Sequence, residues 1–407
     1  MPSAPTDFAT RILSLDVLRG VAVMGILVAN LPGFALPGAA YFSPLAWGGT
    51  APADIAAWLA TFVLVEGKMR GLFSFLFGAS MLLVIDRAGD DAARVHLSRM
   101  AALFAIGIAH MYLIWGSDIL AHYALIGAFA FIFARLPTAA LLIGGLTLLT
   151  LQLLGGIAET QLLWSSAGQR TPEALLVWEA NSAGFGVPPQ SDLLEEIAAF
   201  RSGWGENIAW RYDRLLGPIG AVFVNGVETL GAVLLGMAGY RSAFLTGEWS
   251  RPHYRRWAVV CLGIALPGYA ALGIATYDHG FDQRWVFLGS IGISAPLRTL
   301  GFVGYAALFM LLIRAGGRTT ERIAAVGRAA FTNYLGTSIL MTFVFYGWGL
   351  GQFAGWSRAQ LYALVPLAWL IMLAWSKSWL DRLRYGPLEW LWRSLARLEL
   401  QPMRPRQ

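Results

Sequence analysis

Long apolar stretches recur along the whole chain, separated by short segments rich in polar residues, glycine or proline. A helix needs about 20 largely apolar residues to cross a lipid bilayer. Ten stretches reach or approach that length, at approximately residues 12–32, 53–86, 99–115, 118–135, 138–158, 218–240, 256–276, 294–314, 327–346 and 360–379. The pattern predicts an all-α, polytopic membrane helix bundle of about ten transmembrane helices.

The second stretch, 53–86, is too long for one straight span. At about 1.5 Å per residue it exceeds a hydrocarbon core of about 30 Å. It also contains the polar sequence EGKMRG at residues 66–71. We expect the stretch to bend there or to form two helices.

The spans and the connections between them divide the chain into four predicted regions. These are an N-terminal five-helix membrane half (1–158), an extracytoplasmic loop (159–217), a C-terminal five-helix membrane half (218–380) and a cytoplasmic tail (381–407). Helical patterns at 172–181 and 192–210 in the loop are typical of an interfacial helix, a lid or a plain connector. The tail carries a short amphipathic pattern at 386–393, as expected for a helix on the membrane surface.

Composition and charge narrow the class and orient the bundle. Of the 407 residues, 57% are hydrophobic and 13% charged, which excludes a soluble enzyme and a nucleic-acid-binding protein. If the N-terminus is cytoplasmic, 20 of the 30 lysines and arginines fall on the cytoplasmic side, six on the other side and four inside spans. Because cytoplasmic loops of membrane proteins are enriched in these residues, both termini are predicted to be cytoplasmic.

The most informative polar residues surround the predicted third and fourth spans. His110 precedes a tight hairpin at residues 116–118, which is expected at the outer face. Asp118 is the last residue of this hairpin, and His122 follows it. A histidine held by a carboxylate is a common general base, so His110 with Asp118 is the candidate catalytic pair. The alternative is that His110 bonds a backbone carbonyl and Asp118 only caps the next helix. Ser117 and Asn333 are candidate donors to a developing oxyanion.

Further charged residues lie within the predicted spans, where each costs about 2.5–3.5 kcal/mol and must face protein or water. Asp16 and Arg19 are three residues apart and can form an ion pair, or Arg19 can meet a phosphate. Lys68 and Arg70 suit an anionic group such as the pyrophosphate of coenzyme A, although Glu66 can neutralise them instead.

Arg298 has no acidic neighbour in the sequence, and Glu228 is its candidate partner by charge. The remaining histidines, His96, His253 and His279, fall in predicted loops, and no ligand cluster for a metal is recognisable. The single cysteine, Cys261, excludes a disulfide framework.

Several ordered motifs together resemble the YeiB family, a bacterial multi-pass membrane family catalogued as domain of unknown function 418. They run through most of the chain, at residues 11–20 (RILSLDVLRG), 67–68 (GK) with 72–78 (LFSFLFG), His110 with 116–120 (GSDIL), 327–334 (GRAAFTNY) and 386–393 (GPLEWLWR). The resemblance implies a bacterial cytoplasmic (inner) membrane protein.

The first motif also resembles the opening of the wider transmembrane acyltransferase group, which includes heparan-alpha-glucosaminide acetyltransferase. Those enzymes move an acyl group from cytoplasmic acyl-CoA to an acceptor across or within the membrane. In the heparan enzyme a catalytic histidine precedes a Trp and an Asp after the first helix. Here Trp47 and Asp54 match that pattern, but Pro44 stands at the histidine position.

These features lead to three functional hypotheses. The first is a membrane-embedded acyltransferase that uses acyl-CoA, acetyl-CoA above all, with Arg19, Lys68 and Arg70 as anion contacts and His110 as base. The second is a proton-coupled transporter or exporter of a small lipid-like or sugar-linked substrate. The third is a membrane assembly protein with a structural charge network. Expected partners are membrane lipids, acyl-CoA, an acceptor and a second copy of the chain, with no metal and no nucleic acid.

Overall fold

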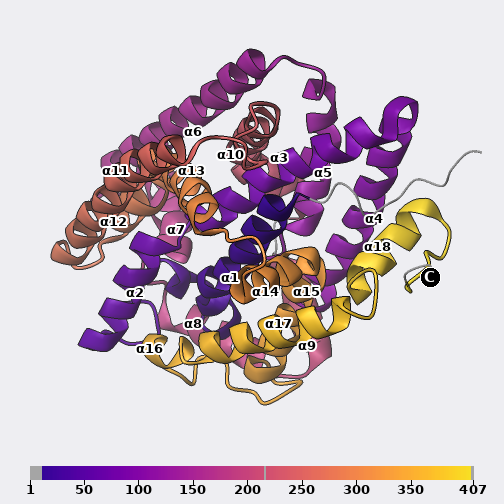
Figure 1. The fold of residues 1–407 in the computed structure, drawn as a ribbon. Coiled ribbons are helices and arrows are strands. Elements are labelled where there is room, and N and C mark those ends of the chain that lie inside the picture. Colours follow the sequence, from indigo (N-terminus) through magenta and orange to yellow (C-terminus); the bar gives the residue numbers. More distant parts are fainter. Residues whose placement is uncertain (1–11, 215–216, 405–407) are drawn as a thin grey trace, which may run out of the picture.

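The computed structural model describes residues 12–214 and 217–404, and every regular element within them is helical (Figure 1). Seven of these helical segments are long and apolar enough to cross a membrane, one of them a continuous run of three helices. The prediction of an all-α, polytopic membrane protein is therefore confirmed. Arg11 at the start of the first motif and Arg406 in the tail lie outside the described residues.

The first half of the chain contains six α-helices. They are α1 (Leu13–Ala35), α2 (Pro52–Leu64), α3 (Lys68–Ala88), α4 (Ala92–Leu113), α5 (Leu120–Ala130) and α6 (Thr138–Ser166), with short 3₁₀ turns at Gly38–Tyr41, Gly89–Asp91 and Phe131–Phe133. The predicted interruption within 53–86 is confirmed, because α2 ends at Leu64 and α3 begins at Lys68. Met69 packs against Gly25 in the middle of α1, so the break lies inside the bundle.

The predicted loop 159–217 differs from expectation at its start, at the end of its first helix and in its second helix. The helix α6 continues through Glu159 to Ser166, so the connection begins later than the apolar pattern indicated. Three short helices follow, namely α7 (Pro172–Phe185), α8 (Gln190–Arg201) and α9 (Trp204–Arg214). The predicted helix 192–210 is interrupted at Ser202–Gly203, where the chain turns between α8 and α9.

The second half contains α10 (Pro218–Arg241), α11 (Arg251–Asp278), α12 (Gln283–Phe287), a π-helical turn (Leu288–Gly292), α13 (Ala295–Leu312), α14 (Arg318–Arg328), α15 (Ala330–Phe345), α16 (Arg358–Leu361), α17 (Leu364–Leu380) and α18 (Pro387–Arg397). The predicted span 327–346 is not one helix from its start, because α14 ends at Arg328 and α15 begins at Ala330. Gly327 of α14 lies directly against the backbone carbonyl of Asp16, so α14 packs closely on α1.

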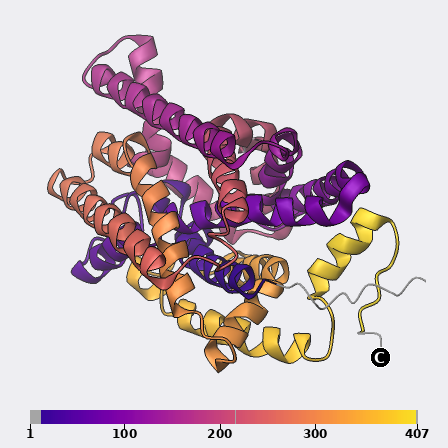
Figure 2. The ribbon, with the colours of Figure 1, turned by 45° about the horizontal axis from the view of Figure 1, so that its top comes forward.

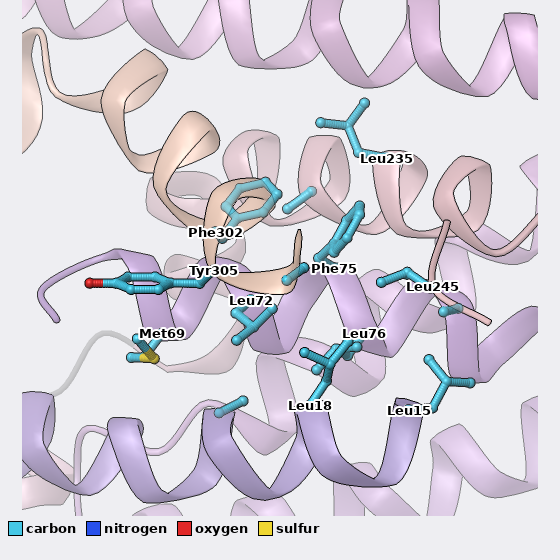
Figure 3. Packing of buried hydrophobic residues seen from close by; sticks show 14 of the residues in the cluster. Leu15, Leu18, Met69, Leu72, Phe75, Leu76, Leu235, Leu245, Phe302 and Tyr305 are labelled. Carbon is cyan, nitrogen blue, oxygen red and sulfur yellow. The ribbon is translucent and has the colours of Figure 1, made fainter. Parts of the chain in front are cut away.

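The helix α3 occupies the centre of the bundle. Its residues Leu72 and Phe75 pack between Leu18 of α1 and Phe302 of α13, as Figure 3 shows. Leu235 of α10 belongs to the same buried cluster. Figure 2 shows α6 along an outer flank and α18 near the C-terminus. This arrangement leaves the N-terminal end of α3, with its charged residues, in the interior.

The two ends of the bundle can be told apart along α4. Trp392 of α18 donates a hydrogen bond to the carbonyl of Arg99, whereas Arg211 of α9 donates to the carbonyl of Tyr112. These two positions are about 20 Å apart along a helix. We call the α18 end the inner end and the α9 end the outer end, and the arginine distribution predicts that the inner end is cytoplasmic.

Candidate functional site

The predicted pair of His110 and Asp118 is formed in the structure. The Nδ1 atom of His110, in the last turn of α4, lies 2.8 Å from Oδ1 of Asp118, and both residues are buried. The second carboxylate oxygen accepts from the backbone N–H of Leu120, at 2.9 Å, and of Ala121. One carboxylate thus caps the start of α5 and orients the histidine, which unites the two roles considered for it.

The contacts of the pair define what His110 can do chemically. Because a carboxylate accepts at Nδ1, we assign the imidazole proton to that nitrogen, which leaves a lone pair on Nε2. Nε2 is buried and has no hydrogen-bond partner among the described residues. The hydroxyl of Tyr334 on α15 also donates to Asp118, at 3.3 Å. The arrangement is that of an oriented base with its reactive nitrogen unoccupied.

The pair lies deeper than the predicted hairpin at the outer face. Arg211 of α9 is buried and donates to the carbonyls of Tyr112, Leu113 and Ile114, so the end of α4 is covered. Along α4, His110 lies eleven residues, about 16 Å, beyond Arg99. Along α15, Tyr334 lies about 16 Å before the outer end of that helix, so the site occupies the middle of the bundle.

A cavity of about 310 Å³, here called the inner cavity, leads from the inner end toward this pair. Its deep wall includes Tyr123 and Tyr334. Arg19 lies on the side wall of this cavity, where it donates hydrogen bonds to Asp16, at 3.0 Å, and to Ser80. Six arginines in all line it: Arg19, Arg87, Arg99, Arg328, Arg384 and Arg393. So many guanidinium groups around one apolar cavity favour a phosphate-bearing ligand with an apolar arm.

A second cavity, of about 410 Å³ and here called the outer cavity, lies on the other side of Tyr123. Asp118 and Tyr123 are on its wall, and Tyr123 therefore borders both cavities. The Tyr123 hydroxyl is 2.5 Å from that of Ser74, so Tyr123 is held in place between the two cavities. The polar residues that line the outer cavity include Arg70, Ser117, Asp118, His122, Arg214, Asn225 and Thr229.

Apart from the Asp16–Arg19 pair, the intramembrane charges form one cluster around the break between α2 and α3. Glu228 of α10 bonds Arg298 at 2.6 Å and Arg70 at 3.0 Å, which confirms the predicted partner of Arg298. Lys68 is fully buried and donates to the carbonyls of Phe62 and Glu66. Of the three predicted anion contacts, Arg19 thus lines the inner cavity, Arg70 lines the outer cavity, and Lys68 lines neither.

The other predicted site residues are divided between roles. Ser117 lines the outer cavity, and Nε2 of His122 lies 2.9 Å from the Thr229 hydroxyl on that wall. The amide of Asn333 is fully used elsewhere, because it donates to Ser376 and to the Val326 carbonyl and accepts from Trp375. Asn333 therefore holds α15 against α17 and α14.

Sequence reasoning missed Tyr123, Tyr334 and Arg99 and misplaced His96. His96 lies within α4 and not in a loop; it is buried, bonds the Gly127 carbonyl at 2.9 Å and lines the inner cavity. His253, also expected in a loop, lies in the first turn of α11. A tyrosine in an apolar helix carries no special signal, and Tyr334 reaches Asp118 across 216 residues of sequence. In this part of α5 the sequence marked only the neighbouring His122 as a candidate.

The residues that match the heparan enzyme have structural contacts here. The indole of Trp47 donates to the Ala354 carbonyl, and Asp54 accepts from the backbone N–H of Ala359 at the start of α16. Neither contacts His110, so the pattern around Pro44 builds no base. Within residues 12–214 and 217–404 no group of three or more potential ligands is arranged to hold a metal ion.

Comparisons with known proteins identify the family. The chain is 33% identical to the uncharacterized protein YeiB of Escherichia coli (strain K12), over 95% of this chain and 96% of that one. It is 31% identical to the uncharacterized protein YxaH of Bacillus subtilis (strain 168), over 98% and 97%. The chain belongs to the YeiB family.

The family model of a protein of unknown function, DUF418, matches residues 239–399 of this YeiB-family chain. That segment contains Arg298 of the charge cluster and Tyr334, which contacts Asp118. His110 lies before it, in a part that both relatives cover.

Proposed function

We propose that this YeiB-family protein is a membrane-embedded acyltransferase that moves an acyl group from acyl-CoA to a hydroxyl or amine acceptor. One observation carries the proposal: Asp118, which orients His110, lies on the wall of the outer cavity, its partner Tyr334 lies on the wall of the inner cavity, and the two cavities share Tyr123. A donor and an acceptor bound in the two cavities would meet at the pair. The proposed setting is a bacterial inner membrane with both termini cytoplasmic.

The inner cavity suits the donor. Its arginines can hold the phosphates of acetyl-CoA at the inner end, and its apolar wall can take the pantetheine arm and acyl group. Although His110 was expected near the outer face, in this proposal cytoplasmic acyl-CoA approaches it through the inner cavity. Arg19 and Arg99 are the proposed anion contacts, in place of the buried Lys68.

The transfer itself is an ordinary addition and elimination at a thioester. Nε2 of His110 removes the proton of the acceptor hydroxyl or amine as the acceptor atom attacks the thioester carbonyl. The tetrahedral intermediate collapses with loss of the CoA sulfur, which receives the same proton from the imidazolium. Asp118 stabilises the charged imidazole, and the Tyr123 hydroxyl, which borders both cavities, is the proposed donor to the oxyanion.

The decisive experiment uses purified full-length protein with radiolabelled acetyl-CoA and a panel of alcohols, amines and sugars. We expect CoA release with transfer of label, and about 10²-fold or more loss of rate in His110→Gln. His253→Gln is the matched control, because His253 is exposed and bonds only Ser250 among the described residues. Failure to bind, hydrolyse or transfer acetyl-CoA, or a fully active His110→Gln, overturns the proposal.

A second candidate function is proton-coupled transport. Its supporting observation is that Tyr123 lies between two cavities at opposite ends of the bundle, as expected of an alternating-access carrier. In proteoliposomes a carrier would show substrate-dependent proton flux without acyl-CoA. Acetyl-CoA turnover without such flux favours the transferase.

A further inference from the structure

We infer that the outer cavity binds an anionic head group, a phosphate or carboxylate, through Arg70 and His122. This names the chemical class of the acceptor, and it rests on the proposed function only in calling the ligand an acceptor. The binding site itself follows from four features of the outer cavity.

The first feature is an excess of positive charge in the cluster behind the cavity. One carboxylate, Glu228, serves two guanidinium groups, those of Arg70 and Arg298. The charges of Glu66 and Lys68 sum to zero, whether both side chains are ionised or the lysine proton has moved to the glutamate. Among these five side chains one positive charge therefore remains, and the Asp118 carboxylate is a negative charge on the same cavity wall as Arg70.

The second feature is the place where that charge is accessible. The Arg70 side chain is 34% exposed and lines the outer cavity, whereas that of Arg298 is 2% exposed. Asn225 accepts from one Arg70 nitrogen at 3.0 Å and Glu228 accepts from the other, so the guanidinium is fixed in position. A fixed guanidinium is well suited to take two oxygens of a phosphate or carboxylate.

The third feature is an unpartnered nitrogen on the same wall. His122 is 4% exposed, and its Nδ1 has no hydrogen-bond partner among the described residues. We assign the Thr229 hydroxyl as the donor to Nε2, which places the imidazole proton on Nδ1, where no described residue accepts it. Buried polar groups are nearly always paired in proteins, so this nitrogen indicates a missing acceptor.

The fourth feature is that the acidic groups of the wall are already engaged. Asp118 is the acid on this wall, and both of its oxygens are occupied, by His110 and Tyr334 and by two backbone N–H groups. Arg214, at the edge, pairs with Glu195. A volume of about 410 Å³ falls within the range of small-molecule sites. An anion at Arg70 would thus leave room for a neighbouring hydroxyl or amine beside Tyr123.

The test measures binding to the purified full-length protein without acyl-CoA. The soluble probes are glycerol 3-phosphate and glycerate, with glycerol as the neutral match, each followed by calorimetry in neutral detergent. The membrane arm compares phosphatidylglycerol with phosphatidylcholine in nanodiscs, with the retained lipid measured by mass spectrometry. A soluble anion that binds assigns a free substrate, and selective retention of phosphatidylglycerol alone assigns a lipid head group.

Arg70→Gln and His122→Phe are each expected to weaken anion binding roughly tenfold or more, the effect of losing one charge-assisted hydrogen bond. His122→Phe leaves the ion pairs intact, so it serves even if Arg70→Gln fails to fold. Arg284→Gln, an exposed cation that does not line the cavity, should bind normally.

No binding of any anionic probe, or binding that both variants leave unchanged, overturns the inference. Anion binding without acetyl transfer would retain this inference and remove the proposed function. Transfer to a neutral acceptor at an undiminished rate in Arg70→Gln would retain the proposed function and remove this inference.

Discussion

Single residues in this protein combine structural and chemical roles, and Asp118 is the clearest example. Its two oxygens separate the roles, because one orients His110 and the other caps α5. Asn is as good a helix cap as Asp, but it carries no charge. Substitution by Asn and by Ala can therefore resolve the two contributions.

We predict that Asp118→Asn keeps the fold and loses about 10²-fold or more of the transfer rate, because the amide no longer stabilises a charged imidazole. Asp118→Ala should lose the same activity and, in addition, about 1 kcal/mol of stability through the missing cap. Acetyl-CoA turnover and thermal unfolding measure the two effects. An Asn variant within a few-fold of wild-type activity would contradict the assignment.

How far the sequence predicts the site depends on chain distance. His110 and Asp118 are eight residues apart on either side of a turn, so their contact was predictable. Tyr334 reaches the site from another helix, and nothing local marks it, whereas Arg70 was marked by its charge within a predicted span. Glu228 and Arg298 were matched only because each lacked another partner within the membrane.

A second residue-scale feature is Gly67, at the break between α2 and α3. Its φ of +67° suits glycine, and an added Cβ would overlap the Arg298 side chain. Arg298 cannot easily move, because it is bonded to Glu228, Ser290 and Ser294.

We predict that Gly67→Ala destabilises the protein by about 1–3 kcal/mol, through strain at positive φ and displacement of Arg298. Gly263→Ala in α11, where a Cβ meets nothing within 4 Å, is the matched control and should be neutral or slightly stabilising. Thermal unfolding in detergent compares them. Equal midpoints for the two variants would show that the break tolerates a side chain.

At the scale of elements, polar residues within an apolar stretch predicted a break between two helices, whereas a break caused by tertiary packing was not predicted. The charges at 66–70 marked the gap between α2 and α3. The gap at Ala329 was missed because residues 327–331 are small or apolar apart from Arg328, and the interruption arises where Gly327 meets the α1 backbone. Such a contact between distant segments leaves no periodic signal in the chain.

Another element-scale feature is the N-terminal cap of α12, formed by Asp282. Its carboxylate accepts from the Arg284 side chain at 2.8 Å and from the Arg284 backbone N–H at 2.9 Å. The hydrogen bond from the Arg284 guanidinium lowers the pKa of Asp282. A lowered carboxyl pKa stabilises the fold above the ordinary Asp range, and the contribution is lost as pH falls through the lowered value.

We predict that α12 is better protected from amide hydrogen exchange in wild type than in Asp282→Asn at neutral pH. Asn keeps a neutral cap, so the difference should decline as pH falls below about 4. Comparing the two proteins at each pH cancels the intrinsic pH dependence of exchange. An advantage of wild type that is constant down to about pH 3 would exclude the charged cap as its cause.

At the scale of the whole molecule, the orientation depends on how α2 and α3 cross the membrane. The contact of Met69 with Gly25, midway along α1, and the bond of Arg19 to Ser80 show that α3 runs from the middle of α1 toward its start. We therefore expect α2 and α3 to be two parts of one crossing. Counting them as two crossings would reverse every later loop and place most arginines outside.

Alkaline phosphatase, active only outside the cytoplasm, can test this directly in three exposed turns where glycine has no neighbour within 4 Å. We predict an active reporter after Gly168 and inactive reporters after Gly89 and Gly316, with a fluorescent protein at the C-terminus folding in the cytoplasm. The reason is that arginine-rich connections stay on the cytoplasmic side. An active reporter at Gly316 with an inactive one at Gly168 would mean that the whole bundle is inserted the other way, and would place the arginine-lined cavity on the side where acyl-CoA is absent.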